Sequence, residues 1–165
     1  MISNTSATIT IRIATIADVE AITSVINKAF AQAERSFIDS DRIDGKQVSD
    51  FLKSGKFFLA ESGNILLGCV YIEKRGDRAY LGLLSVNPDT QQYGVGSLLM
   101  DIGENDARSQ GCRYMDLSVV NLRKELVRYY KRRGYVETGT GAFPAEVKTK
   151  VPVHFINMSK EISNQ

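Results

Sequence analysis

The chain has 165 residues, of which 43% are hydrophobic and 24% are charged, and its formal net charge is +2. These values predict one globular domain over residues 1–165 and give no indication of a nucleic-acid or membrane-surface partner. No apolar run approaches the roughly twenty residues that a membrane-spanning helix needs.

Location, disulfides and metal sites can be judged from a few residues. The first six residues lack the basic start and apolar core of a secretion signal, so a cytoplasmic location is expected. Cys69 and Cys112 both lie in apolar surroundings, which favours two small core residues over a disulfide. His154 is the only histidine, and no group of residues has the spacing of metal ligands, so no metal site is predicted.

The chain is expected to begin with a strand and a helix. Ile9, Ile11 and Ile13 alternate with polar residues, which predicts a half-buried strand. Thr15 and Asp18 then have the spacing of a helix-starting capping box. An apolar stripe on one helical face follows, made of Val19, Ile22, Ile26 and Ala29.

The segment from residue 31 to residue 55 is acidic, and a second helix is predicted around Gly45 to Lys53. Its acids are Glu34, Asp39, Asp41, Asp44 and Asp50. Two interpretations stay open: a solvated surface, or a rim that attracts a cationic amine.

Three strands are predicted next, at 57–60, 65–73 and 79–86, with Gly68 as a candidate bulge. The connections between them are short turns, so the three strands should form an antiparallel meander. Pro88 ends the third strand because it has no N–H to donate to a ladder.

A glycine-rich turn, Gln91-Gln92-Tyr93-Gly94-Val95-Gly96, separates the third of these strands from a helix. Val95, Leu98, Leu99 and Ile102 form that helix's apolar stripe, and Gly111 suits its C-terminal cap. Such a turn directs unpaired N–H groups and the positive end of the helix dipole at one point. The sequence therefore predicts an anion site, most simply for a phosphate.

Two common phosphate-binding motifs fit this turn poorly. A kinase-like P-loop needs a lysine after the glycines, and the turn has none. A dinucleotide-binding turn needs a third glycine where Leu99 stands, and its acidic partner would be Asp116, which lies inside a strand-like run.

The last third of the chain predicts a strand, a helix and two closing strands. Residues 114–120 form an apolar strand, parallel to strand 79–86 through the intervening helix. A helix is expected from Asn121, with Leu122, Leu126 and Tyr130 on one face and Gly134 as its cap. The closing strands are expected at 135–138 and 151–158, with a loop at 139–144 between them.

Two motifs together resemble the GNAT family, the Gcn5-related N-acetyltransferases. One is Gln91-x-x-Gly94-x-Gly96 after a strand ending in Val-x-Pro, and the other is Tyr130-x-x-x-Gly134-Tyr135 at the end of the last helix. The predicted order β-α-α-β-β-β-α-β-α-β-β is also that of the family, and the resemblance covers nearly the whole chain. It implies an α/β fold with a central mixed sheet flanked by helices.

The resemblance implies acetyl-CoA as the acetyl donor and a primary amine as the acceptor. The donor would be held by the glycine-rich turn and by backbone groups of the preceding strand, which would pair with the pantetheine arm like an added strand. The implied donor-binding residues are Leu84, Ser85, Val86, Gln91, Gln92, Tyr93, Gly94, Val95, Gly96, Ser97 and Asn121. Asn121 has a second interpretation, as the N-cap of the last helix.

The resemblance also implies that Tyr130 is the general acid that protonates the leaving thiolate. The neighbouring Tyr129 lies about 100° further round the helix and is expected to point elsewhere. Many family members carry a glutamate on the strand before the phosphate turn, and residues 79–86 contain none. Glu73, Glu137 and His154 are the candidates for a general base, and none is assigned.

The sequence does not identify the acceptor, which is a small-molecule amine or a peptide amine. A different class of protein, a GNAT-like module that binds acyl-CoA without turnover, is the alternative. The last helix carries many cations, which suit either a solvated face or a contact with the 3′-phosphate of CoA. The family often forms dimers, so a homodimer is left open, although no interface is indicated.

Overall fold

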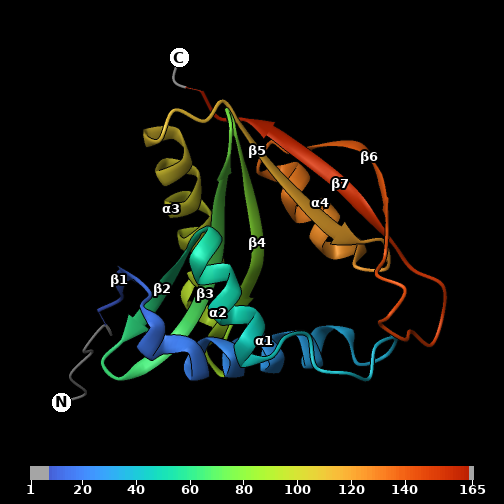
Figure 1. Cartoon of the computed structure of the whole chain (residues 1–165), viewed down its shortest axis with the longest axis horizontal. Helices are drawn as coiled ribbons and strands as arrows, with labels where there is room; N and C mark the ends of the chain where they lie inside the picture. The colour runs from blue at the N-terminus through green and yellow to red at the C-terminus, as the bar shows by residue number, and fades with distance from the viewer. Residues whose placement is uncertain (1–7, 164–165) are drawn as a thin grey trace.

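The computed structural model describes residues 8–163, and the side chains of Gln91, Gln92 and Tyr93 lie outside this description. A seven-stranded mixed sheet is flanked by four helices, as predicted (Figure 1). The strands are β1 (Thr10–Ile13), β2 (Lys56–Ser62), β3 (Ile65–Arg75), β4 (Arg78–Val86), β5 (Tyr114–Val120), β6 (Val136–Ala142) and β7 (His154–Glu161). The helices are α1 (Val19–Glu34), α2 (Gly45–Ser54), α3 (Val95–Ser109) and α4 (Lys124–Arg132), with short 3-10 turns at Ile16–Asp18 and Pro88–Tyr93.

The sheet has the order β1-β2-β3-β4-β5-β7-β6, and β4–β5 is its only parallel pair among the described residues. That pair is short, running from Arg78 opposite Tyr114 to Tyr80 opposite Asp116. Beyond Tyr80 the two strands diverge, and the sheet opens there (Figure 1). The predicted meander of β2, β3 and β4 is confirmed.

Two apolar clusters cover opposite faces of the sheet. In β2, Phe57 and Leu59 pack with α1 and α2, whereas Phe58 and Ala60 pack with the cluster that contains α3 and α4. This alternation follows from the two-residue period of a strand. Because both faces are covered, β2 and β3 are apolar almost without interruption.

The predicted core cysteines and the predicted helix start are both confirmed. Cys69 and Cys112 are buried and unpaired. Thr15 and Asp18 form the reciprocal hydrogen bonds of a capping box, although they enclose a 3-10 turn that precedes α1. The Arg12 guanidinium binds the Asp18 carboxylate through two hydrogen bonds of 2.9 and 2.7 Å, so β1 is tied to the start of α1.

The last helix begins later than the sequence pattern indicates. Its N-cap is Arg123, so the second interpretation of Asn121, as the N-cap, is wrong, and Leu122 lies outside the helix at 37% exposure. The reason is that Asn121 accepts a hydrogen bond from the backbone N–H of His154 at 2.9 Å, which holds a turn at the end of β5.

The loop predicted at 139–144 is displaced as well. Residues 139–142 belong to β6, where Gly139 pairs with Asn157 and Gly141 with Phe155. Pairing with β7 here overrides the low strand propensity of glycine. The connection between the two strands instead runs from residue 143 to residue 153. No helix within residues 8–163 is long and apolar enough to cross a membrane.

Candidate active site

A cavity of about 720 Å³ occupies the opening between β4 and β5. Its walls are the second half of β4, the end of β5, the first turn of α3 and the tyrosines of α4. It continues to the end of α1, the segment that follows α1, and part of the β6–β7 connection. One cavity thus reaches from the glycine-rich turn to the acidic segment.

A bulge in β4 shapes the central wall of this cavity. Tyr71 of β3 pairs with Gly82 and Cys69 pairs with Ser85, so two residues of β4 stand opposite one residue of β3. Leu83 adopts a left-handed conformation, with φ of 53°, and the Ser85 hydroxyl donates to the Leu83 carbonyl at 3.0 Å. A bulge of this kind re-aims the strand that carries it.

The bulge shifts by one residue the alternation of β4 side chains between the two faces of the sheet. Ala79 and Leu81 pack on the α3 and α4 side, Leu83 packs on the α1 and α2 side, and Leu84 then returns to the first side. Within the described residues, no strand pairs with the outer edge of β4 beyond Tyr80. That edge therefore offers backbone groups to the cavity.

The first turn of α3 forms the next part of the wall. Gly94 has φ of 67°, a left-handed conformation that suits glycine, and α3 begins at Val95. The amides of Val95, Gly96 and Ser97 precede the first helical hydrogen bond, which runs from the Leu98 N–H to the Gly94 carbonyl. Unpaired amides and the helix dipole make this corner of the cavity attractive to anions.

The structure brings most of the predicted site residues together. Those that line the cavity are Leu84, Ser85, Val86, Gly94, Val95, Gly96, Ser97 and Tyr130. Asn121 does not line it, and its side-chain oxygen is engaged with β7. The side chains of Gln91, Gln92 and Tyr93 lie outside the described part of the chain, so their predicted contacts cannot be placed.

Tyr130 is buried at 6% exposure and packs edge-on against Tyr129 and Tyr135. Burial raises the pKa of its hydroxyl, so the group is protonated at neutral pH. Its hydroxyl has no hydrogen-bond partner among the described residues, yet it is not sealed off, because Tyr130 lines the cavity. Tyr130 therefore presents a protonated hydroxyl to the cavity.

The expectation that Tyr129 points elsewhere is wrong. Tyr129 also lines the cavity, and its hydroxyl lies 3.0 Å from the hydroxyl of Ser97. The long tyrosine ring reaches the first turn of α3, so α4 and α3 are joined beside the anion-attracting amides.

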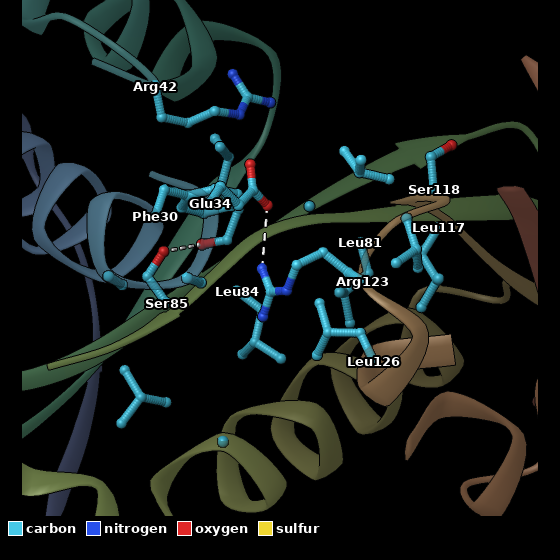
Figure 2. A pocket seen from close by; sticks show the side chains of 18 of the residues that line it. Phe30, Glu34, Arg42, Leu81, Leu84, Ser85, Leu117, Ser118, Arg123 and Leu126 are labelled. Atoms are coloured by element: carbon cyan, nitrogen blue, oxygen red, sulfur yellow. Dashed lines mark hydrogen bonds and ion pairs between the residues drawn. The ribbon is translucent and has the colours of Figure 1, made fainter. Parts of the chain in front are cut away.

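A buried ion pair occupies the other end of the cavity and was missed from the sequence. Glu34, the last residue of α1, is 5% exposed, and its Oε2 lies 3.0 Å from Nη1 of Arg123 (Figure 2). Burial raises the pKa of the Glu34 carboxyl, and the charges of Arg123 and Arg42 oppose this rise. The sequence contained a clue to the burial of Glu34, because this residue follows Ile22, Ile26 and Phe30 at intervals of four residues on the apolar face of α1.

None of the three candidate bases lies at the cavity. Glu73 accepts hydrogen bonds from the Tyr71 hydroxyl at 2.6 Å and from Arg75, and these bonds hold its pKa below the usual range. Glu137 is exposed and pairs with Lys131, and His154 is exposed at the start of β7. Among residues 8–163, no three histidine, cysteine or acidic side chains are grouped so as to hold a metal ion.

Comparisons with known proteins agree with this geometry. The model of the acetyltransferase (GNAT) family matches residues 21–135. The mycothiol acetyltransferase of Streptomyces coelicolor is 32% identical over 113 residues, which are 66% of this chain and 36% of that protein. The chain therefore spans only about a third of the length of this curated relative.

Two solved structures show the same fold over nearly the whole chain. The ribosomal-protein-S18-alanine N-acetyltransferase of Escherichia coli superposes with a TM-score of 0.76 at 17% identity, covering 96% of each chain. The structure of yncA from Salmonella typhimurium, a putative acetyltransferase with its cofactor acetyl-CoA, has a TM-score of 0.73 at 20% identity, again covering 96% of each chain.

Proposed function

Because the chain belongs to the acetyltransferase (GNAT) family, we propose that it moves an acetyl group from acetyl-CoA directly to a primary amine. The observation that carries this proposal is the single cavity that joins the α3 amides, the free edge of β4 and the Tyr130 hydroxyl. Residues 1–165 would act as one acetyltransferase domain in the cytoplasm. Its acceptor would be a small-molecule or peptide amine.

The donor would lie along backbone groups. The amides of Val95, Gly96 and Ser97 are suited to the pyrophosphate of CoA, because no described residue accepts a hydrogen bond from them and they stand at the positive end of α3. The free edge of β4 at Leu84 to Val86 is suited to the amide groups of the pantetheine arm, in the manner of an added strand. Gln91 would add a neutral hydrogen bond, weaker than one from an arginine.

The chemistry needs a stabilised oxyanion and a protonated leaving group. A backbone N–H of β4 beside the bulge would stabilise the negative charge that develops on the carbonyl oxygen of the acetyl group. Tyr130 would donate its proton to the departing sulfur. A free thiol has a pKa near 8.5 and a tyrosine near 10, so this transfer is uphill by about 2 kcal/mol before burial raises the Tyr130 pKa further.

The alternative is a module that binds acyl-CoA without turnover. One observation favours it: none of the three bases considered from the sequence lies at the cavity. The two functions predict the same donor binding and differ in whether thiol is released when amines are added.

Isothermal titration with acetyl-CoA tests the proposal, with NAD and ATP as controls. We expect micromolar binding of acetyl-CoA and no binding of NAD or ATP. Thiol release with a set of amines would then separate the enzyme from the binding module. No binding of acetyl-CoA would overturn the donor assignment and, with it, the proposed roles of Gly94, Gly96 and Tyr130.

A further inference from the structure

Glu34 is a carboxylate in the wall of the cavity, at the end opposite the α3 amides. Figure 2 shows it extending from α1 toward Arg123, across the space above β4. Its Oε2 accepts a hydrogen bond from Arg123, whereas Oε1 accepts none from any described residue. Oε1 is also not among the fully buried atoms. One oxygen of Glu34 is therefore held by Arg123, and the other is available to a ligand in the cavity.

The charged groups around Glu34 include one carboxylate in excess, because Glu34, Glu125 and Asp41 are accompanied by only two guanidiniums, and this leaves room for one more cation. Arg123 also binds the exposed Glu125, so one guanidinium is shared by two carboxylates. Arg42, from the α1–α2 connection, lies over the ring of Phe30 and faces the same space (Figure 2). Asp41, from the same connection, and the hydroxyls of Tyr80, Tyr129 and Tyr130 are the other titratable groups that line the cavity.

A primary amine with a pKa near 10 is only about 0.1% neutral at pH 7, so an acceptor arrives as an ammonium ion and must lose a proton before it attacks. Building on the proposed function, we infer that Glu34 binds the acceptor ammonium through Oε1 and takes its proton, while Arg123 holds the carboxylate in place. Buried carboxylates are suited to this task, because burial moves their pKa toward neutral pH.

The proton balance of this step closes. The ammonium gives one proton to Glu34, and the neutral amine then forms the C–N bond as the C–S bond breaks. The thiolate takes the Tyr130 proton, and one of the two protons on the acetylated nitrogen passes to the Tyr130 phenolate, which leaves the product amide with one N–H. Glu34 releases its proton to solvent, so one proton is released in each turnover.

The first test uses the unmodified protein. Its kcat/KM is measured from pH 6 to pH 9 with acetyl-CoA and the fastest of three probes: 2-phenylethylamine, spermidine and an alanyl tripeptide amide. A protein base gives a profile that is flat between the pKa of the carboxyl and the pKa of the amine. A rise of about tenfold per pH unit across the range would mean that only the free amine reacts, and would overturn the inference.

The second test compares Glu34→Gln with Asp50→Asn. Asp50 belongs to the same acidic segment, but it lies on α2 at 54% side-chain exposure and away from the cavity. We expect Glu34→Gln to lower kcat/KM about 10²-fold at pH 7, with the deficit shrinking about tenfold per pH unit, and Asp50→Asn to change neither. Glu34→Asp should restore part of the rate, because it keeps the carboxylate.

Acetyl-CoA affinity helps to distinguish a failure of the Glu34 inference from a failure of the proposed function. It should be the same in the unmodified protein and in all three variants, and equal melting temperatures would show that each is folded. If kcat/KM of Glu34→Gln is lowered by the same factor at every pH, Glu34 has a structural role. That result would overturn this inference and leave the proposed function standing. Acetyl-CoA binding without acetylation of any probe would instead overturn the proposed enzyme, and this inference with it.

Discussion

The two ends of the cavity are built differently. The end proposed for the donor consists mainly of backbone: the bulge of β4, the left-handed Gly94 and the first amides of α3. The end proposed for the acceptor consists of side chains on segments distant in sequence, such as Glu34 and Arg123. Backbone groups suit a ligand that never changes, whereas side chains can be exchanged without moving the fold, so acceptor choice should depend on them.

Tyr130 lines the cavity from α4, and removal of its hydroxyl should have the largest effect. We expect Tyr130→Phe to lower kcat by about 10²-fold to 10³-fold, because the thiolate loses its proton donor. The affinity for acetyl-CoA should stay within about twofold, because the ring and its packing are kept. Steady-state kinetics and titration calorimetry measure the two effects.

Tyr129→Phe is the matched control, since it removes the neighbouring hydroxyl and its contact with Ser97. It should weaken acetyl-CoA binding slightly and leave most of kcat. Equal losses of kcat in the two variants would contradict the role given to Tyr130.

Gly68→Ala would test how far the donor end depends on the path of β4. A Cβ at Gly68 would lie 2.6 Å from the carbonyl oxygen of Ser85 and 3.1 Å from Val95, so β4 or α3 must move. We expect a loss of about 1–3 kcal/mol in the free energy of unfolding, with weaker acetyl-CoA binding. Gly139→Ala is the control, because a Cβ there meets nothing within 4 Å, and its effect should stay below about 0.5 kcal/mol.

Gly94→Ala should have a smaller effect on the same end. A Cβ at Gly94 would touch no other residue, so its cost comes only from the left-handed backbone and should be about 1 kcal/mol in urea unfolding. Gly96 is the second residue of α3, where the backbone is already helical and alanine is favoured over glycine, so Gly96→Ala should not destabilise the protein. Equal stability of Gly94→Ala and the parent chain would show that residue 94 does not need the left-handed conformation.

The donor end could be predicted from the sequence because its signals are local. Gly94 and Gly96 follow Pro88 within a few residues, and together they define a turn between a strand and a helix. The bulge at Leu83 could not be predicted in this way, because leucine has no preference for a positive φ and the run from Tyr80 to Val86 resembles a regular strand. The bulge becomes visible only when β3 supplies the register.

At the acceptor end, the acidic segment that contains Glu34 was considered as a rim for a cationic amine, but the ion pair of Glu34 with Arg123 was missed because its signals are long-range. The Glu34–Arg123 pair joins residues 89 positions apart, and each residue alone resembles part of a charged surface. The Glu34 position on the apolar face of α1 was a local clue, but it does not indicate a partner. Chemical type alone selected Glu73, Glu137 and His154 as candidate bases, and type does not indicate position. Glu73, for example, is held by Tyr71 and Arg75 away from the cavity.

The smallest effect is expected at the Arg12–Asp18 ion pair, which fixes the start of the helix that carries Glu34 at its end. The hydrogen bonds from Arg12 lower the pKa of Asp18 from 3.8 to about 2. Because the folded-state pKa is the lower one, the stabilisation is complete above about pH 4 and is lost as the pH falls toward 2. Arg12 is 44% exposed, so water screens the pair and we expect Asp18→Asn to cost about 1 kcal/mol or less at pH 7.

Urea unfolding of Asp18→Asn and the parent chain at pH 7, 4 and 2 measures this difference, which should vanish at the lowest pH. Asp89→Asn is the control, because Asp89 and its partner Lys28 are both largely exposed and their pair should contribute almost nothing. Acetyl-CoA affinity should not change in Asp18→Asn, because the donor end contains no part of α1. Weaker donor binding in Asp18→Asn would show that the two ends of the cavity are mechanically coupled, and the division drawn between them would then fail.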